Sequence, residues 1–356
     1  MSKLLRRLIP AGALMLLTAA AVGAALLWPA FWFSFYTDFS RWAMRVLGAV
    51  FGWIPFPVWE PALVLLVLLV PAGLVWAIKK KKLLSWLSLL LTVLVVLGSL
   101  FMGLWGLNHL APTIGEQLGL EVRPYSVQEL QDAAAWYASQ ANAYADRVAR
   151  DADGNVTVPE VSVLSDEAVE AYSHLAAEND RFADPAARVK PLLVSKAFAY
   201  GGTTGVFVCL TGEASVSTET YSLSLPFTVC HELGHSLAVA RENEANYLAF
   251  LACRASESDL FRYSGYYNAY VYCFNALYRE DRSKAQSLWA LCSEELLHDA
   301  NTHVAYNKQY EGKVQKAAQA VNNAYLKTFT EAGTKSYGLV VDYLIAEYLK
   351  QGTGNK

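Results

Sequence analysis

The stretch TVCHELGHSLAVARENEANY, residues 228–247, carries the pattern that decides how the C-terminal part of this chain is expected to fold. It contains His-Glu-x-x-His, with His231 and His235 four residues apart and Glu232 directly after the first histidine. On a helix, residues four apart share a face, so the two imidazoles can converge on one metal ion while Glu232 stands beside the ion's open position. The stretch therefore predicts a helix with a site for one Zn²⁺ per chain, of the kind used in hydrolysis.

A catalytic zinc site has three protein ligands and keeps a fourth position for water, so one more ligand is needed. If the helix continued unbroken from His235, Glu242 would lie ~10 Å further along the axis. The chain is therefore expected to break near residues 238–241 and turn back, so that the next helix presents Glu242 and Asn246 on one face. Asn246 is then placed to hydrogen-bond a ligand. Glu244 points about 200° away from Glu242 and remains the alternative third ligand.

The N-terminal part contains three apolar runs without a charge, at residues 8–33, 61–78 and 83–107. Each is near or above the ~20 residues that cross a bilayer core. They also explain why 54% of the chain is hydrophobic and why its mean hydropathy reaches +0.23. Residues 1–107 are thus predicted to be a membrane region with three transmembrane helices.

Basic residues set the expected orientation of these helices. Lys3, Arg6 and Arg7 at the N-terminus and the lysines at 79–82 are expected to stay cytoplasmic. The first helix then exits, the second returns and the third exits again, which leaves the remaining chain outside the cytoplasm. A cleaved signal peptide is the alternative for the first run, but that run is long compared with an apolar region of ~7–15 residues.

Charge is divided unevenly between the two parts of the chain. Of 29 Lys plus Arg and 32 Asp plus Glu, 9 and 2 fall within the first 110 residues, which leaves 20 basic and 30 acidic residues beyond them. This acidic balance argues against a nucleic-acid partner. The expected partners are the lipid bilayer and a peptide or protein substrate. Residues 36–60 combine Arg41 and Arg45 with Trp and aliphatic residues, which predicts a helix lying in the membrane interface.

Residues 108–125 are interpreted as a linker, residues 126–350 as an extracytoplasmic domain and residues 351–356 as a disordered tail. The domain is predicted to be mainly α with a small β-sheet. Its helices are expected at 127–150, 165–179, 245–253, 258–278, 281–297, 313–329 and 340–349, and its strands at 189–195 and 205–210. The five cysteines stand singly in apolar patterns, which favours packed thiols over disulfides.

Beyond the bare motif, HExxH followed by Glu with Asn four residues later resembles the gluzincin metallopeptidases, such as thermolysin and the CAAX prenyl protease type. HELGH with ExEAN is similar to ImmA/IrrE-like peptidases. The layout of the whole chain resembles still more closely an uncharacterised bacterial membrane family, known only as a domain of unknown function. The stretches that carry this resemblance are 204–207 (TGVF), 211–214 (TGEA), 226–232 (PFTVCHE), 242–246 (ENEAN), 262–266 (RYSGY) and 336–338 (SYG).

The gluzincin resemblance implies a zincin-like α+β domain in which His231, His235 and Glu242 hold zinc. Glu232 would take a proton from water and pass it to the leaving amine. An electrophilic side chain should also steady the oxyanion. The first candidates are Tyr263, Tyr266 and Tyr337, and His298 and His303 are the next. A packed aromatic face is the alternative for the tyrosines of the 258–278 helix, and His109 is expected on the surface.

The same resemblance implies an edge strand beside the metal helix that pairs with an extended peptide, a role open to residues 205–210 if they are not core sheet. It also implies a glycine in the turn after the second histidine, where this chain has Ala238. The leading functional hypothesis is a membrane-anchored zinc metallopeptidase. The alternative is a catalytically silent binding or sensing domain stabilised by zinc, although such a site has no need of a base like Glu232.

Overall fold

The computed structural model describes residues 3–183, 185, 188–329 and 339–354. Within them, three helices are long and apolar enough to cross a membrane, namely α1 Lys3–Leu27, α4 Trp59–Lys79 and α5 Leu83–Leu104. The prediction of three apolar helices is confirmed, and their orientation stays a prediction. The first ends at Leu27 and not at residue 33, because Pro29 has no N–H for a continuing helix and begins the short helix α2 Pro29–Phe33.

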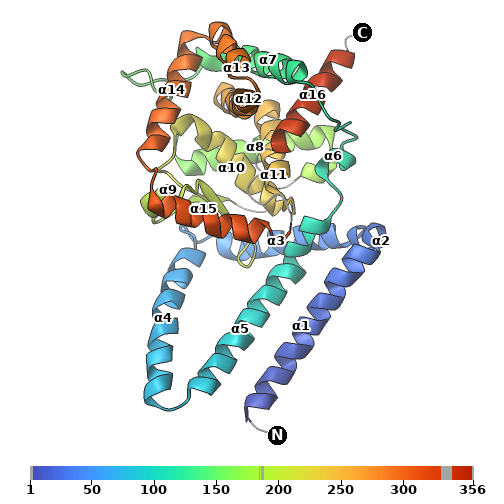
Figure 1. Cartoon of the computed structure of the whole chain (residues 1–356), viewed down its shortest axis with the longest axis vertical. Coiled ribbons are helices and arrows are strands. Elements are labelled where there is room, and N and C mark those ends of the chain that lie inside the picture. The colour runs from blue at the N-terminus through green and yellow to red at the C-terminus, as the bar shows by residue number, and fades with distance from the viewer. Residues whose placement is uncertain (1–2, 184, 186–187, 330–338, 355–356) are drawn as a thin grey trace.

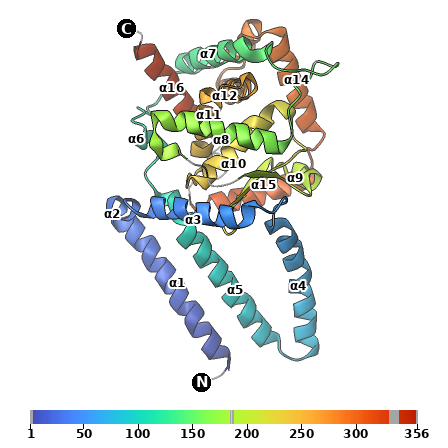
Figure 2. The same cartoon turned by 180° about the vertical axis from the view of Figure 1, so that it is seen from behind.

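Helix α3, Tyr36–Gly52, lies across the ends of the three apolar helices that face the rest of the chain (Figures 1 and 2). It is attached to the end of α5 by two hydrogen bonds. The Tyr36 hydroxyl donates to the main-chain oxygen of Met102 at 2.9 Å, and Ser40 Oγ donates to that of Leu104 at 2.7 Å. The opposite side of α3 is exposed and carries Trp42, as expected for a helix in the membrane interface.

The chain beyond α5 forms a mainly helical domain with a small sheet, which confirms the predicted fold class in this general form. Its helical segments are η1 Gly106–Leu110, α6 Ile114–Gln117, α7 Val127–Ala145, α8 Val161–Glu178, η2 Asp180–Phe182, α9 Ser195–Gly201, η3 Ser222–Ser224, α10 Leu225–Ser236, α11 Glu242–Ala255, α12 Asp259–Glu280, α13 Arg282–Ser287, η4 Leu288–Leu291, α14 Glu294–Lys308, α15 Lys313–Leu326 and α16 Val340–Gly354.

Several segments differ from the sequence-based expectations. Helix α7 ends at Ala145 and not at 150, and strand β1 ends at Pro191, before helix α9, which was not predicted. A single helix over 281–297 is wrong, because Ser293 starts a new helix by accepting a hydrogen bond from the main-chain N–H of Leu296. Helix α16 continues to Gly354, inside the tail that was expected to be disordered.

The sheet has three strands in the described part of the chain, β1 Val189–Pro191, β2 Gly205–Val208 and β3 Glu213–Val216. Their order is β1-β3-β2, with β1 parallel and β2 antiparallel to β3. The central strand β3 was not predicted. Strand β2 ends at Val208, before residue 210, because the chain turns back through Gly212, whose φ of 65° favours glycine. In this order β2 is an edge strand.

Helix α10, which carries the His-Glu-x-x-His motif, lies at the centre of the domain. All 12 of its residues are buried. It packs against α8, α11, α12 and the sheet, and the core around these elements includes the fully buried Tyr137, Tyr172, Tyr263 and Phe250. A site on α10 is therefore reached only through a cavity.

Buried carboxylates fasten the apolar helices to the domain. Glu60, in the first turn of α4, accepts hydrogen bonds from the main-chain N–H groups of Leu193 and Val194. Glu213 on β3 accepts from the N–H of Val58 at 3.0 Å and pairs with Lys190 Nζ at 2.7 Å. The two parts of the chain are thus joined by hydrogen bonds to buried carboxylates.

Candidate metal centre

The chain bends sharply between α10 and α11, as predicted for residues 238–241. Helix α10 ends at Ser236, α11 begins at Glu242, and Ala238 between them has a φ of 67°. An L-residue with a side chain pays about 1–2 kcal/mol for this left-handed conformation. The turn returns α11 along α10 and so brings Glu242 back to the two histidines.

Three possible ligand atoms converge at this point. The Nε2 atoms of His231 and His235 are 3.1 Å apart, and Glu242 oxygens lie 3.3 Å from the first and 3.9 Å from the second. Ligands at bonds of about 2.0–2.1 Å from a tetrahedral zinc stand about 3.3 Å apart. Two imidazoles and a carboxylate at these distances therefore fit a zinc ion, and together they form the group of the described residues that could hold a metal.

Neighbouring groups orient both imidazoles. His235 Nδ1 lies 2.7 Å from the main-chain oxygen of Val239, so Nδ1 carries the proton and the lone pair of Nε2 faces the other ligands. Although burial disfavours a charged imidazole, interactions with Glu242 and Asn246 raise the pKa of His231. Its Nδ1 and the Nδ2 of Asn246 are both buried without a hydrogen-bond partner in the described part of the chain. Turning the Asn246 amide over would let its oxygen accept from Nδ1–H.

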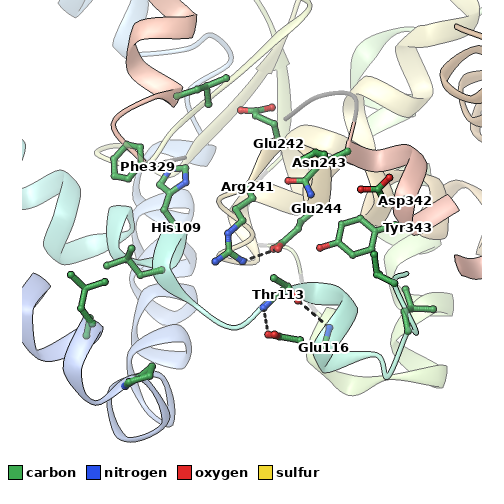
Figure 3. Close-up of a pocket in the computed structure, with 18 residues that line it drawn as sticks. His109, Thr113, Glu116, Arg241, Glu242, Asn243, Glu244, Phe329, Asp342 and Tyr343 are labelled. Atoms are coloured by element: carbon green, nitrogen blue, oxygen red, sulfur yellow. Dashed lines mark hydrogen bonds and ion pairs between the residues drawn. The ribbon is translucent and has the colours of Figure 1, made fainter. Parts of the chain in front are cut away.

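Glu244 is held away from this point by Arg241. Arg241 donates to Glu244 Oε1 at 2.8 Å and to the main-chain oxygen of Ala111 at 2.6 Å. In Figure 3 the carboxylate of Glu244 points toward Arg241, whereas that of Glu242 points the opposite way. Of the two predicted third ligands, the structure brings Glu242 to the histidines.

The buried ionisable groups are held in different protonation states when no metal is present. Burial raises the pKa of Glu232 to about 8, opposed by the charge of His231 and reinforced by that of Glu242. The pKa of Glu242 is lowered to about 2, since its hydrogen bond with His231 and the histidine charges outweigh the effect of burial. Burial lowers the pKa of His235 to about 4. The site thus offers a carboxylate and a neutral imidazole, the forms that bind a cation.

Glu232 stands beside the three possible ligands, and one of its carboxylate oxygens, Oε2, has no hydrogen-bond partner among the described residues. Its side chain is 4% exposed. Buried polar atoms are normally hydrogen-bonded, so an orphan carboxylate oxygen indicates a group that serves a ligand. A Cβ atom on Gly205 would come within 2.3 Å of Glu232 Oε1, so the start of β2 lies directly against this carboxylate.

Two cavities meet at Glu242. A cavity of about 1150 Å³ has His231, Glu232 and His235 on its wall and is bordered by β2, α12, α15 and the end of α5; it is called the site cleft below. A second cavity, of about 820 Å³, lies on the other side of Glu242 and is shown in Figure 3. The possible ligands are therefore accessible from the site cleft despite the burial of α10.

Tyr263 does not reach the site, contrary to the role predicted for it. It is fully buried, and its hydroxyl donates to Asp299 Oδ2 at 2.5 Å. Asp299 also accepts from Tyr221 and is paired with Arg150 at 2.8 Å. None of these residues lines the site cleft, so the position of Tyr263 indicates a structural role.

Of the other residues predicted to stabilise the oxyanion, some line the site cleft and some do not. Tyr266 stacks on Tyr144 at a centroid distance of 5.9 Å and lies outside the site cleft, and His298 faces Asn155. His303 does line the site cleft, where its Nδ1 lies 2.8 Å from the Tyr267 hydroxyl. Tyr337 lies outside the described residues.

Two residues near the site were missed from the sequence. His109, expected on the surface, is 6% exposed; its ring stacks on Phe329 at 4.0 Å, and its Nε2 has no partner among the described residues. Tyr272 on α12 lines the site cleft, and burial together with the charge of Glu242 raises its pKa. Nothing in the pattern of the 20 tyrosines distinguishes Tyr272 from its neighbours.

A sequence model of one protein family, described as "Protein of unknown function (DUF3810)", matches residues 35–345. The match begins just before α3 and ends within α16, so it covers two of the three apolar helices and the domain together. The expected likeness to a family known only as a domain of unknown function is confirmed. No curated protein and no solved structure matches the chain.

Proposed function

We propose that this chain, which belongs to the DUF3810 family, is a membrane-anchored, zinc-dependent metallopeptidase. One observation carries the proposal: His231, His235 and Glu242 converge on one point, with the unpartnered carboxylate of Glu232 beside it. Structural zinc sites are usually closed by four protein ligands, whereas catalytic sites have three and an open position. A base next to an open position favours hydrolysis.

The residues divide the work of peptide hydrolysis among them. Bound zinc would supply a water of lowered pKa and polarise the substrate carbonyl. Glu232 accepts the proton that the attacking water loses and delivers it to the amine nitrogen as the C–N bond breaks. Val239 and Asn246 keep the two imidazoles oriented. The free edge of β2, whose first residue Gly205 lies against Glu232, offers main-chain groups to an extended peptide.

The alternative remains a catalytically silent binding or sensing domain in which zinc acts as a clamp. Such a clamp requires neither the site cleft of about 1150 Å³ nor an unpaired buried carboxylate. Both features favour the enzyme.

The substitution Glu232→Gln separates these possibilities in purified full-length protein. It should keep one zinc per chain by elemental analysis and abolish cleavage of a peptide library that the native protein cleaves. Glu257→Gln makes the same chemical change at an exposed residue and should alter neither property. If the native protein contained no zinc, the proposal would be refuted. Zinc without cleavage by the native protein would favour the clamp, and undiminished cleavage by Glu232→Gln would refute the mechanism.

A further inference from the structure

We infer that the substrate of this site is a peptide tethered to the same bilayer and cleaved in the extended stretch directly outside its anchor. The inference rests on the proposed peptidase function and narrows its substrate class. Three observations support it: the site lies close to the end of a membrane helix, a helix with an apolar exposed side borders the site cleft, and β2 runs from the membrane surface to Glu232.

The possible metal ligands stand directly over the end of a membrane helix. Trp105 follows Leu104, the last residue of α5, and its indole Nε1 donates to the main-chain oxygen of His235 at 2.9 Å. Phe101, three residues before the end of α5, lines the site cleft. At 1.5 Å per residue, Phe101 lies only about 5 Å inside the end of the helix. The wall of the site cleft thus begins within the membrane-spanning segment.

Helix α15 borders the site cleft on the side of the membrane. In Figure 1 it lies across the base of the domain, above the outer ends of α4 and α5. At one end, the Tyr325 ring is 6.4 Å from that of Phe101 on α5. At the other end α15 packs on α9, whose Phe198 contacts Trp59 at the start of α4 with ring centroids 5.8 Å apart. Contacts at both ends therefore place α15 at the membrane surface.

The exposed side of α15 is apolar next to the site cleft. Val314, Val321 and Tyr325 are 62%, 72% and 40% exposed. At 100° per residue they project within about 40° of one another, so they form one stripe. Val321 and Tyr325 also line the site cleft. Exposed apolar side chains of this kind are unfavourable in water and favourable in a membrane interface. The border of the site cleft is therefore suited to contact with lipid.

Strand β2 leads from the membrane surface to Glu232. The turn after β2 packs on α3, where a Cβ on Gly212 would come within 2.7 Å of the main-chain nitrogen of Gly48. The other end of the strand, at Gly205, touches Glu232. A peptide paired with the free edge of β2 would rise about 3.3 Å per residue, so it would reach Glu232 roughly ten residues or fewer beyond its anchor.

The domain cannot readily turn this surface away from the bilayer. Rotation would break the hydrogen bonds of Glu60 with Leu193 and Val194 and leave this buried carboxylate without those partners. It would also separate Val58 from Glu213, which would keep only its ion pair with Lys190. A tethered substrate, in contrast, arrives at the site cleft with a high effective concentration. The same fixed geometry thus disfavours soluble proteins and favours membrane-tethered ones.

The first test maps new protein termini in cells of the source organism that carry either the native chain or Glu232→Gln. Termini that require Glu232 should lie within about ten residues of a transmembrane segment or a lipid-modified residue, and the identity of the parent proteins distinguishes these two anchors. Glu232-dependent termini in soluble proteins would overturn the inference and leave the peptidase function standing. If no terminus depends on Glu232, the proposed function fails and the inference fails with it.

The second test uses the peptide spanning a mapped site, synthesised with and without its anchor, and full-length protein in lipid nanodiscs. The tethered form should be cleaved at least about tenfold faster than the free form. Val314→Asp with Val321→Asp should bring this ratio toward one. Leu291→Asp is the matched control, since Leu291 is 53% exposed on η4, which packs on α7 at the end of the domain opposite the membrane helices, and it should keep the ratio. Equal rates for the tethered and free peptides with the native protein would overturn the inference.

Discussion

Gly205 and Glu232 are in direct contact: a Cβ atom on Gly205 would lie 2.3 Å from Oε1 of Glu232 and 2.7 Å from its Cδ. The first residue of an edge strand thus touches the predicted base. A peptide paired with β2 would be delivered to the carboxylate, and the absence of a side chain at residue 205 leaves the space that the carboxylate occupies.

Replacing Gly205 by Ala should therefore impair hydrolysis through Glu232. The added methyl group must displace a buried carboxylate, so we expect at least a tenfold loss of peptide cleavage with the zinc content retained. Gly201→Ala is the matched control, because its Cβ would meet the nearest atom only at 3.8 Å. Full activity of Gly205→Ala at native zinc content would contradict the role of this contact.

Glu242 and Glu244 should respond differently to the same substitution. Glu242→Gln removes a charged ligand, and its zinc affinity should fall by more than the roughly 10- to 100-fold typical of an outer supporting residue. Glu244→Gln keeps the ligands and loses only an ion pair with Arg241, so its zinc affinity should stay within a few-fold of native. Titration with a competing chelator measures both. Loss of zinc from Glu244→Gln alone would reverse the assignment.

Ala238→Gly should stabilise the protein. Glycine adopts a φ of 67° without the clash of a Cβ atom, and we expect a gain of about 1 kcal/mol in the free energy of unfolding. Ala240→Gly lies in the same turn, without a positive φ, and should destabilise it. Chemical denaturation of the two variants decides the matter. If both were destabilised alike, the turn would not be strained.

His303 should make stability depend on pH. Burial lowers its pKa from 6.5 to about 4, so between these values the unfolded chain binds a proton that the folded chain does not. Its contribution is therefore present above pH 6.5, is lost as the pH falls toward 4, and amounts to on the order of 3 kcal/mol. Unfolding free energies at pH 7 and pH 5 should differ less in His303→Gln than in the native protein. An unchanged difference would show that His303 does not titrate in this way.

The features that the sequence predicted well depend on local spacing. The length of the apolar runs determines which helices can cross a bilayer, and the helical repeat places His231 and His235 on one face. The distance from His235 to Glu242 requires a bend, and the structure has it at Ala238. Each of these conclusions follows from residues close together in the chain.

The features that were missed depend on contacts between distant segments. His109 is buried because Phe329, 220 residues later in the printed sequence, stacks on its ring. The motif around Tyr263 makes it a candidate, but the packing of α7, α10 and α11 around α12 decides which side of α12 faces the site cleft. Strand β3 is short, and its neighbours β1 and β2 come from either side of α9. Periodicity along one segment cannot supply these relationships.

The contacts of Glu213 and Lys190 join the sheet to a segment from the N-terminal part of the chain. Lys190 Nζ donates to the main-chain oxygens of Phe51 and Phe56, and Glu213 accepts a hydrogen bond from the N–H of Val58. The buried charges of the sheet are therefore hydrogen-bonded by the segment at the end of α3 and the start of α4. That segment precedes β3 by well over a hundred residues in the chain. The segment between α3 and α4 therefore forms part of the interior of the domain. A fragment beginning after α5 would lack part of its own interior, and it should be studied only together with the helices that precede it.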